Sequence, residues 1–133
     1  MLSVLIAEDN EINALLARSL LTRLGHCPTV AVSGAAALEA WRAARTSSTP
    51  YDLVLMDVHM PGLDGLEATR RIRASETEAS QRRTPIIALT ANAFAEERDA
   101  CLAAGMDGFL VKPLDRERLA AAIATREQCP IAA

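Results

Sequence analysis

Residues 53–57 read Leu53-Val54-Leu55-Met56-Asp57, four apolar residues that end in a carboxylate. A short and continuously apolar run is typical of a parallel strand that is covered on both faces. Three further runs of this kind each lead into a polar side chain: 4–7 into Glu8 and Asp9, 86–89 into Thr90, and 108–111 into Lys112. Because the carboxyl ends of parallel strands share one edge of a sheet, we expect the five polar side chains to converge there.

The size and composition of the chain limit the classes of protein it can belong to. It has 133 residues, of which 50% are hydrophobic and 23% are charged, which is enough for one domain with one core. A net charge of −3, with no basic run among aromatic residues, argues against binding to nucleic acid. No apolar run is long enough to span a bilayer, and the N-terminus has no secretory pattern. These features predict a cytoplasmic domain without direct membrane contact.

The cysteine and aromatic residues indicate packing rather than chemistry. Cys27, Cys101 and Cys129 have no paired spacing, and His26 and His59 are the two histidines that could join them in a metal site. That is a poor set for a soft metal, so we expect free thiols. Aromatic residues make up 3% of the chain, which leaves little for a base-stacking platform or a flavin site. Trp41 is predicted to pack in or near the core, and His26 to lie exposed in a turn.

Helical patterns alternate with the strand runs, which predicts repeated βα units and a parallel sheet. The first helix is expected from near Asn10 to just before Gly25, with a stripe formed by Ile12, Leu16 and Leu20. The other expected elements are a strand over 29–32, a helix over 35–45 behind Ser33 as N-cap, a helix from Gly65 with a capping box of Asp64 and Glu67, a polar and mobile loop over 75–84, a helix over 95–104 that stops at Gly105, and a last helix from Asp115 to near Thr125. The domain is therefore expected to occupy 1–125, with 126–133 as a disordered tail or linker remnant.

The polar groups at the predicted sheet edge suggest a metal site and a reactive carboxylate. Three carboxylates at contact distance repel one another by roughly 4 kcal/mol per pair, so a cation is needed between them. Hard oxygen ligands favour Mg²⁺, with Mn²⁺ as a substitute, and Mg²⁺ usually takes one or two protein carboxylates. Asp57, alone at the end of the central run, is the candidate for the carboxylate that reacts, as a phosphoryl acceptor. Lys112 and Thr90 would then bind the phosphoryl oxygens.

Each of these residues also has an ordinary structural explanation. An acidic pair before a helix, such as Glu8 and Asp9, most often caps the helix or compensates its dipole. Asp57 could cap a loop, Thr90 could be a plain strand residue, and Lys112 could be a solvated strand end. Taken together, four such coincidences at four strand ends are far less probable than one functional site.

Four segments resemble the receiver domain of two-component response regulators, over essentially the whole chain. They are 6–10 (Ile-Ala-Glu-Asp-Asn), 55–65 (Leu-Met-Asp-Val-His-Met-Pro-Gly-Leu-Asp-Gly), 88–92 (Ala-Leu-Thr-Ala-Asn) and 110–113 (Leu-Val-Lys-Pro). The resemblance implies a doubly wound, five-stranded, flavodoxin-like sheet in the order 2-1-3-4-5. It implies that Asp57 takes a phosphoryl group from a phosphohistidine on a partner. Glu8, Asp9, Asp57 and the backbone carbonyl of His59 become the Mg²⁺ site, Thr90 and Lys112 the phosphate contacts, and the Lys112–Pro113 bond is expected to be cis.

The resemblance also implies a switch and a set of partners. Thr90 would move toward the phosphoryl group while Phe109 rotates inward, which shifts the packing of the fourth helix, last strand and last helix. Phe109 lacks the tyrosine hydroxyl of many relatives, so a hydrogen-bonded form of this switch is not expected.

Within the family, the segments resemble receivers at the C-terminus of hybrid sensor histidine kinases. The expected partners are a histidine kinase domain, a histidine phosphotransfer protein, or both, and a parent kinase would tether the domain at the inner membrane. The exposed part of the first helix around Ile12 is the predicted docking face for a helical partner.

Other functions remain as alternatives at this point. A phosphatase of the haloacid-dehalogenase type needs an acid two residues after its aspartate nucleophile, where this chain has His59. A flavodoxin-like carrier needs a first loop that binds phosphate, and Glu8 and Asp9 would repel it. A pseudo-receiver, which binds proteins without phosphorylation, is the principal alternative. As a receiver the chain would catalyse its own phosphorylation and dephosphorylation, with a slow to moderate phosphate lifetime, since neither His59 nor Asn92 is an obvious base for water.

Overall fold

The computed structural model describes residues 2–47, 49–60, 62–78, 83–91, 95–112 and 114–128, with side chains as far as Ile123. Five strands alternate with five helices in these ranges. In chain order they are β1 (Ser3–Ala7), α1 (Glu11–Arg23), β2 (Cys27–Ala31), α2 (Gly34–Thr46), β3 (Leu53–Asp57), α3 (Gly65–Glu78), β4 (Ile86–Thr90), α4 (Ala95–Ala104), β5 (Gly108–Val111) and α5 (Arg116–Gln128).

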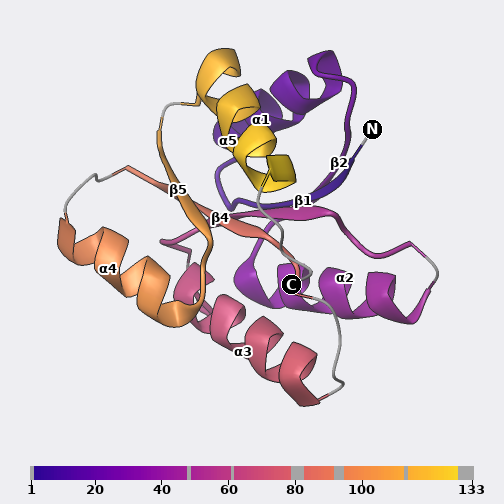
Figure 1. Ribbon diagram of the computed structural model, residues 1–133, viewed down its shortest axis with the longest axis vertical. Helices are drawn as coiled ribbons and strands as arrows, with labels where there is room; N and C mark the ends of the chain where they lie inside the picture. The colour runs from indigo at the N-terminus through magenta and orange to yellow at the C-terminus, as the bar shows by residue number, and fades with distance from the viewer. Residues whose placement is uncertain are drawn as a thin grey trace.

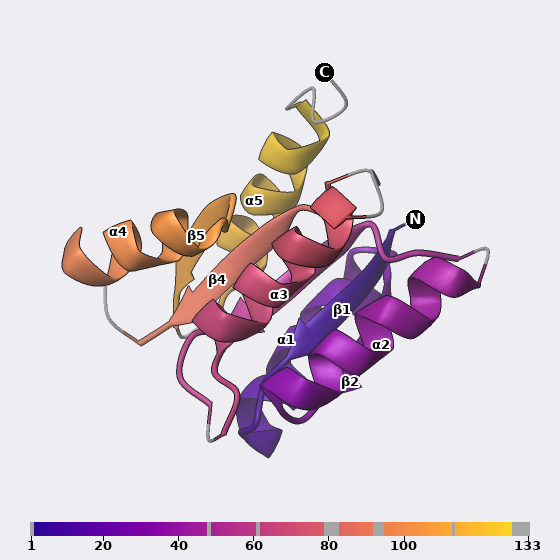
Figure 2. The ribbon, with the colours of Figure 1, turned by 90° about the horizontal axis from the view of Figure 1, so that it is seen from below.

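The five strands form one parallel sheet in the order β2-β1-β3-β4-β5, which confirms the predicted fold. Helices α1 and α5 cover one face, and α2, α3 and α4 cover the other (Figure 1). Figure 2 looks onto the second layer, with α2 and α3 in front of the sheet. The central strands β3 and β4 are buried at every position, as their continuous apolar sequence predicts.

Each face of the sheet has its own apolar core. On the side of α1 and α5, the larger buried side chains are Val4, Ile6, Leu20, Leu21, Leu53, Leu55, Ile87, Leu89, Leu110, Leu114, Leu119 and Ile123. On the side of α2, α3 and α4 they are Leu5, Leu38, Trp41, Val54, Met56, Val58, Met60, Ile72, Ile86 and Met106. Trp41 is 1% exposed, and its indole Nε1 donates to Thr84 Oγ1 at 3.0 Å, so its predicted packing role is confirmed.

Side-chain caps fix the starts of four helices. Asn10 Oδ1 accepts from two backbone N–H groups of α1, those of Ile12 and Asn13. The predicted caps are also present: Ser33 Oγ accepts from Ala36 N, Asp64 Oδ1 from Glu67 N and Asp115 Oδ1 from Arg118 N. Each cap lies in the segment that connects the carboxyl end of a strand to the next helix. The caps therefore also fix the conformation of the loops at that edge of the sheet.

The predicted loop over 75–84 is wrong in its first part, because α3 continues to Glu78. Glu76 is buried, at 5% exposure, and it accepts from Thr84 N at 2.6 Å and from Arg73 Nη1 at 2.8 Å. These bonds satisfy a carboxylate inside the protein and thereby stabilise the last turn of a helix whose sequence looks like a polar loop. Residues 79–82, the middle of that predicted loop, lie outside the described residues.

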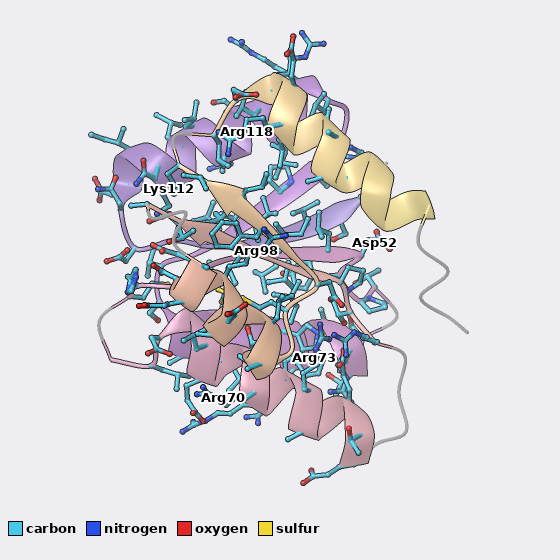
Figure 3. All side chains as sticks on the ribbon, turned by 60° about the vertical axis from the view of Figure 1, so that its left-hand side comes forward. Asp52, Arg70, Arg73, Arg98, Lys112 and Arg118 are labelled. Carbon is cyan, nitrogen blue, oxygen red and sulfur yellow. The ribbon has the colours of Figure 1, made fainter. Side chains whose placement is uncertain are left out.

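Arg73 is the centre of an ionic cluster at the amino ends of β4 and β5, which we call the Arg73 clamp. Besides Glu76, its guanidinium donates to three groups: Thr84 O at 2.7 Å, Gly105 O at 2.9 Å and Asp107 Oδ2 at 2.7 Å. Asp107 also accepts from Ile86 N and from Arg83. The clamp therefore joins the C-terminal part of α3 to the turn between α4 and β5. In Figure 3, Arg73 and Lys112 lie on opposite sides of the molecule.

Three further boundaries differ from the sequence prediction. Strand β2 begins at Cys27 rather than at 29, because Cys27 N already donates to Leu2 O at 2.8 Å, and it ends at Ala31. Pro28 is tolerated there because β2 is an edge strand. Helix α5 continues past Thr125 to Gln128, while the predicted tail over 129–133 lies outside the described residues. No described helix is both long and apolar enough to cross a membrane.

Two predicted side-chain environments also need correction. The buried face of α1 is formed by Ala14, Ala17, Leu20 and Leu21, because small residues let the helix approach the sheet closely. Of the predicted stripe, Leu20 packs against the sheet and Leu16 is exposed. Ile12 is exposed as well, which agrees with its predicted place on a docking face. His26, predicted to be an exposed turn residue, is partly buried, and its Nδ1 accepts from Leu2 N at 3.0 Å.

Candidate functional site

The carboxyl edge of the sheet brings together four of the five predicted polar residues. Glu8 and Asp9 follow β1, Asp57 is the last residue of β3, and Lys112 follows β5. One carboxylate oxygen from each of Glu8, Asp9 and Asp57 lies within 4.8 Å of the others. Lys112 Nζ lies 2.6 Å from Glu8 Oε2 and 3.2 Å from Asp57 Oδ2. The predicted convergence of these side chains is therefore present.

Glu8 is an almost fully buried carboxylate, at 1% exposure. Its Oε1 accepts from Asn10 N at 3.2 Å. Its Oε2 forms an ion pair with Lys112 and has no other donor among the described residues. Burial raises the pKa of Glu8 above its usual value and the Asp57 charge adds to this, while the Lys112 ammonium acts against it. An oxygen of this kind suits a metal ion, because it is buried and still has a lone pair to offer.

Asp57 is also buried, at 4% exposure, and is held from two directions. Its Oδ1 accepts from the backbone N–H of His59 at 3.1 Å, and its Oδ2 accepts from Lys112 Nζ at 3.2 Å. Burial by itself would lower the pKa of Lys112, but the neighbouring Glu8 and Asp57 carboxylates outweigh it and raise that pKa. Lys112 therefore stays charged and is shared between two carboxylates.

Asp9 differs from the other two carboxylates because it is exposed to solvent. The cluster thus has two buried carboxylates and one that opens to the outside, where a hydrated ion could approach. Oxygen ligands of this number and charge suit a hard divalent cation that keeps several waters. The donor set therefore fits the Mg²⁺ that the sequence predicts.

The structure places Thr90, the fifth predicted residue, at the end of β4 with no exposed surface. Its hydroxyl donates to Glu97 Oε1 in the first turn of α4, at 3.0 Å. The same oxygen lies 2.7 Å from Nε2 of His59, whose side chain is 68% exposed. Glu97 thus links the ends of β3 and β4 to α4.

Glu97 is a residue that the sequence analysis did not single out. Acidic residues in the first turn of a helix are common because they compensate the helix dipole, and Glu96 beside it has the same property. The sequence therefore carried no signal that separates the two. Only the fold shows that Glu97 is 14% exposed and bonded to Thr90, whereas Glu96 is exposed.

Gly65, at the start of α3, packs directly against the backbone of Asp57. A Cβ on Gly65 would lie 2.1 Å from the backbone oxygen of Asp57, so only glycine fits without a shift of the strand end. Gly65 N also donates to Val58 O at 3.2 Å. The sequence predicted Gly65 as a helix start, and its close packing against Asp57 is an additional role.

The two remaining predicted residues lie outside this cluster. Phe109 is partly buried against the core beneath α4 and lines a cavity of about 300 Å³ with Arg98, Cys101 and Leu102. Ile12 is 79% exposed on the first turn of α1, and Leu15 nearby is 64% exposed. Asn92 and Pro113 lie outside the described residues, so neither the predicted cis bond nor the surroundings of Asn92 can be compared with the structure.

Relatives of the chain include histidine kinases. A sensor protein GacS of Pseudomonas syringae is 44% identical over 117 residues, which cover 88% of this chain and 12% of that protein. Histidine kinase 5 of Arabidopsis thaliana is 41% identical over 139 residues, 87% of this chain and 14% of that protein. The chain thus spans only about an eighth of the length of these kinases. The two-component response regulator ORR41 of rice is 41% identical, and 93% of each chain is covered.

Solved structures with the same fold include receiver domains of histidine kinases. The receiver domain of the kinase CKI1 from Arabidopsis thaliana, in complex with Mg²⁺ and BeF₃⁻, has a TM-score of 0.84 and 34% identity, covering 96% of this chain and 91% of that one. The receiver domain of the sensor kinase PA1611 from Pseudomonas aeruginosa, with Mg²⁺ in its active-site cleft, has a TM-score of 0.78 and 39% identity, covering 99% and 98%. The family model of the response regulator receiver domain matches residues 4–124, and the chain accordingly belongs to this family of two-component phosphorelay domains.

Proposed function

We propose that Asp57 is the phosphoacceptor of this receiver domain. The observation that carries the proposal is the position of Lys112 between the buried carboxylates of Glu8 and Asp57, with Asp9 beside them at the open edge. In the reaction, a carboxylate oxygen of Asp57 attacks the phosphorus of a phosphohistidine on a partner. The phosphorus–nitrogen bond breaks, an oxygen–phosphorus bond forms, and the imidazole leaves.

The surrounding groups balance the charge of the incoming phosphoryl group. Mg²⁺ held by Asp9, Asp57 and the His59 carbonyl, with Glu8 acting through water, would neutralise part of that charge, and we expect Mn²⁺ to substitute for it. Lys112 already lies 3.2 Å from Asp57 Oδ2, so its ammonium is placed to bind a phosphoryl oxygen. The backbone N–H of His59 holds the other oxygen of Asp57 and so orients the carboxylate. Catalysis in this site is positioning and electrostatic stabilisation.

Thr90 and Phe109 are the proposed switch residues. Thr90 is buried at the end of β4, and the loop that follows it leads to α4. Phe109 lies in β5 and lines the cavity beside α4, which gives its ring room to move. Phosphorylation would draw the Thr90 hydroxyl toward Asp57 and Phe109 inward, which changes the face formed by α4, β5 and α5.

The exposed apolar part of α1 supports docking of a helical partner. Ile12, Leu15 and Leu16 all remain exposed on the first two turns, next to the edge that carries Asp57. Large apolar side chains at such a density mark an interaction surface more often than an ordinary solvated face. A histidine kinase domain or a histidine phosphotransfer protein would present its phosphohistidine from this side. The relatives of the chain support a hybrid kinase as its parent, which would hold the domain on the cytoplasmic side of a membrane.

The proposal can be tested by intact mass after incubation with acetyl phosphate. We expect the gain of one phosphoryl group with Mg²⁺, no gain in EDTA and no gain for Asp57→Asn. Asp99→Asn, a matched change on the exposed surface of α4, should be phosphorylated like the wild-type chain. The absence of any gain with Mg²⁺ or Mn²⁺ would contradict the proposal and favour the pseudo-receiver, which binds a partner without phosphate. The same series followed over time measures the phosphate lifetime.

A further inference from the structure

We propose that Glu97 is a positioning residue that competes with a phosphoryl group on Asp57 for the hydroxyl proton of Thr90. The inference rests on the proposed function, because it concerns how the same site becomes able to bind phosphate. The proposed role belongs to a side chain on α4, outside the loops that surround Asp57.

The competition follows from the bond between Thr90 and Glu97. The Thr90 hydroxyl donates to Glu97 Oε1 at 3.0 Å, and both side chains are largely shielded from water, at 0% and 14% exposure. A hydroxyl has one proton to donate, and a carboxylate is a strong acceptor for it. A bond from Thr90 to a phosphoryl oxygen therefore requires that the bond to Glu97 be given up.

Glu97 is connected to the site through a second residue as well. Its Oε1 lies 2.7 Å from His59 Nε2, and the backbone N–H of His59 donates to Asp57 Oδ1 at 3.1 Å. When Thr90 turns away, Glu97 keeps the contact with His59 and does not become an unpaired buried charge. The exchange therefore costs less free energy than the loss of both partners would.

The two ends of helix α4 are held differently, so the exchange of the Thr90 hydrogen bond can move one end of the helix more than the other. Its C-terminal half holds the buried residues Cys101 and Ala104, and Arg73 fixes the following turn through Gly105 O and Asp107. In the N-terminal half, the described residues Ala95, Glu96, Arg98 and Asp99 are exposed. Release of Thr90 by Glu97 thus loosens the first turn of α4, while the C-terminal end of the helix stays held by the Arg73 clamp and acts as a pivot.

The test is a double-mutant cycle on the affinity for beryllofluoride, a phosphoryl analogue, in saturating Mg²⁺. We expect Glu97→Ala to bind beryllofluoride about tenfold more tightly than the wild-type chain, the size of effect typical of a hydrogen bond to a charged group. Glu97→Gln, which keeps the shape and a weaker acceptor, should lie between the two. In a Thr90→Ala background, Glu97→Ala should leave the affinity unchanged, since no hydroxyl remains to be released.

Glu96→Gln is the control for Glu97→Gln, because it removes the same charge from the same turn of α4 at an exposed position. Its affinity should equal that of the wild-type chain. If Glu97→Ala does not tighten binding, or tightens it equally with Ala at position 90, the inference is wrong, because a general charge effect would then account for the result. If the wild-type chain itself fails to bind beryllofluoride, the proposed function fails first and the inference with it.

A second readout needs neither metal nor phosphate. In EDTA, Glu97→Ala should lower the urea midpoint of unfolding, and should lower it less when position 90 is also Ala. A residue with a merely structural role would weaken both stability and beryllofluoride binding. The inference predicts that Glu97→Ala lowers stability and raises the affinity for beryllofluoride, because Glu97 stabilises the arrangement that excludes the phosphoryl contact. A loss of both stability and affinity would overturn the inference.

Discussion

The ammonium of Lys112 lies 2.6 Å from the carboxylate of Glu8, a side chain that is 1% exposed. The two residues come from opposite parts of the chain, one after β1 and the other after β5, with β3 and β4 between their strands in the sheet. Lys112 also contacts Asp57, so one cation balances two buried carboxylates. The stability of the domain and the charge of its site therefore depend on the same group.

Replacement of Lys112 should expose this dependence. Lys112→Met leaves Glu8 and Asp57 buried without a cation, and we expect the free energy of unfolding in EDTA to fall by about 3 kcal/mol. Mg²⁺ should recover much of this loss, because it supplies positive charge to the same carboxylates. Urea unfolding with and without Mg²⁺ measures both effects. A loss below about 1 kcal/mol would mean that water already screens the two carboxylates.

The Mg²⁺ affinity should depend on pH through Glu8. Mg²⁺ binds the ionised carboxylate, and burial raises the pKa of Glu8 above 4.5. As the pH falls, the affinity should therefore begin to weaken at a higher pH than for an exposed glutamate. In the metal-free chain the raised pKa also means that Glu8 lowers stability as the pH rises above 4.5, since the folded state holds the proton more tightly. Calorimetric titration between pH 5 and 8 tests the first effect, and Glu8→Gln should bind Mg²⁺ more weakly with a flatter pH profile.

The Arg73 clamp should contribute to stability but not to the chemistry of the site. Arg73→Ala removes the charged donor to the buried Glu76 and the bonds that the guanidinium donates to Thr84 O, Gly105 O and Asp107, so we expect a loss of about 3 to 5 kcal/mol in the free energy of unfolding. Arg71→Ala is the matched control on the same helix, because Arg71 pairs with Glu67 on the surface, and should cost under about 1 kcal/mol. Comparable losses for the two variants would contradict the role assigned to the clamp.

Gly65 should be sensitive to a single methyl group. In Gly65→Ala the new Cβ would lie 2.1 Å from the backbone oxygen of Asp57, so the end of β3 must shift and the Mg²⁺ affinity should fall at least severalfold. Gly62→Ala is the control, since a Cβ there meets nothing within 4 Å and only the φ of +75° is unfavourable. That variant should lose about 1 kcal/mol of stability and keep its Mg²⁺ affinity. Equal Mg²⁺ affinities for the two variants would show that the close approach does not position Asp57.

The exposed face of α1 should affect phosphotransfer from a protein but not from a small molecule. Ile12→Ala removes a side chain that is 79% exposed, so stability should change by less than about 0.5 kcal/mol. We expect slower phosphorylation by a phosphorylated histidine phosphotransfer domain and an unchanged rate with acetyl phosphate. Glu39→Ala, at an exposed position of α2 in the other helix layer, is the control and should leave both rates unchanged. Unchanged transfer from the protein donor to Ile12→Ala would place the docking surface elsewhere.

The sequence predicted the strand order and the edge that holds the site, because each strand is a short apolar run with its polar group at the same end. The helix starts at Ser33, Asp64 and Asp115 were equally readable, since a cap acts on N–H groups two or three residues away. Local patterns of this kind do not depend on the rest of the fold.

The features that the sequence did not predict depend on partners that are distant in the chain. Glu76 continues α3 because it meets Arg73 and Thr84 N inside the protein, and nothing in the polar segment 75–78 indicates that burial. Glu97 looks like any acid at the start of a helix until Thr90 is placed beside it. The buried face of α1 was not predicted either, since Ala14 and Ala17 pack against the sheet together with Leu20 and Leu21, while Leu16 of the apolar stripe is exposed.

The Arg73 clamp and the Lys112 cluster lie at opposite ends of the sheet, separated by the length of β4, about 17 Å for five residues. That distance is about twice the screening length of physiological salt, so the added negative charge of a phosphoryl group acts only weakly on the clamp. The clamp thus stabilises the domain at the end of the sheet that lies away from the Lys112 cluster. Substitutions that adapt the exposed surface of α1 to a different partner leave the clamp intact, which gives such a domain room to acquire new signalling connections without losing its fold.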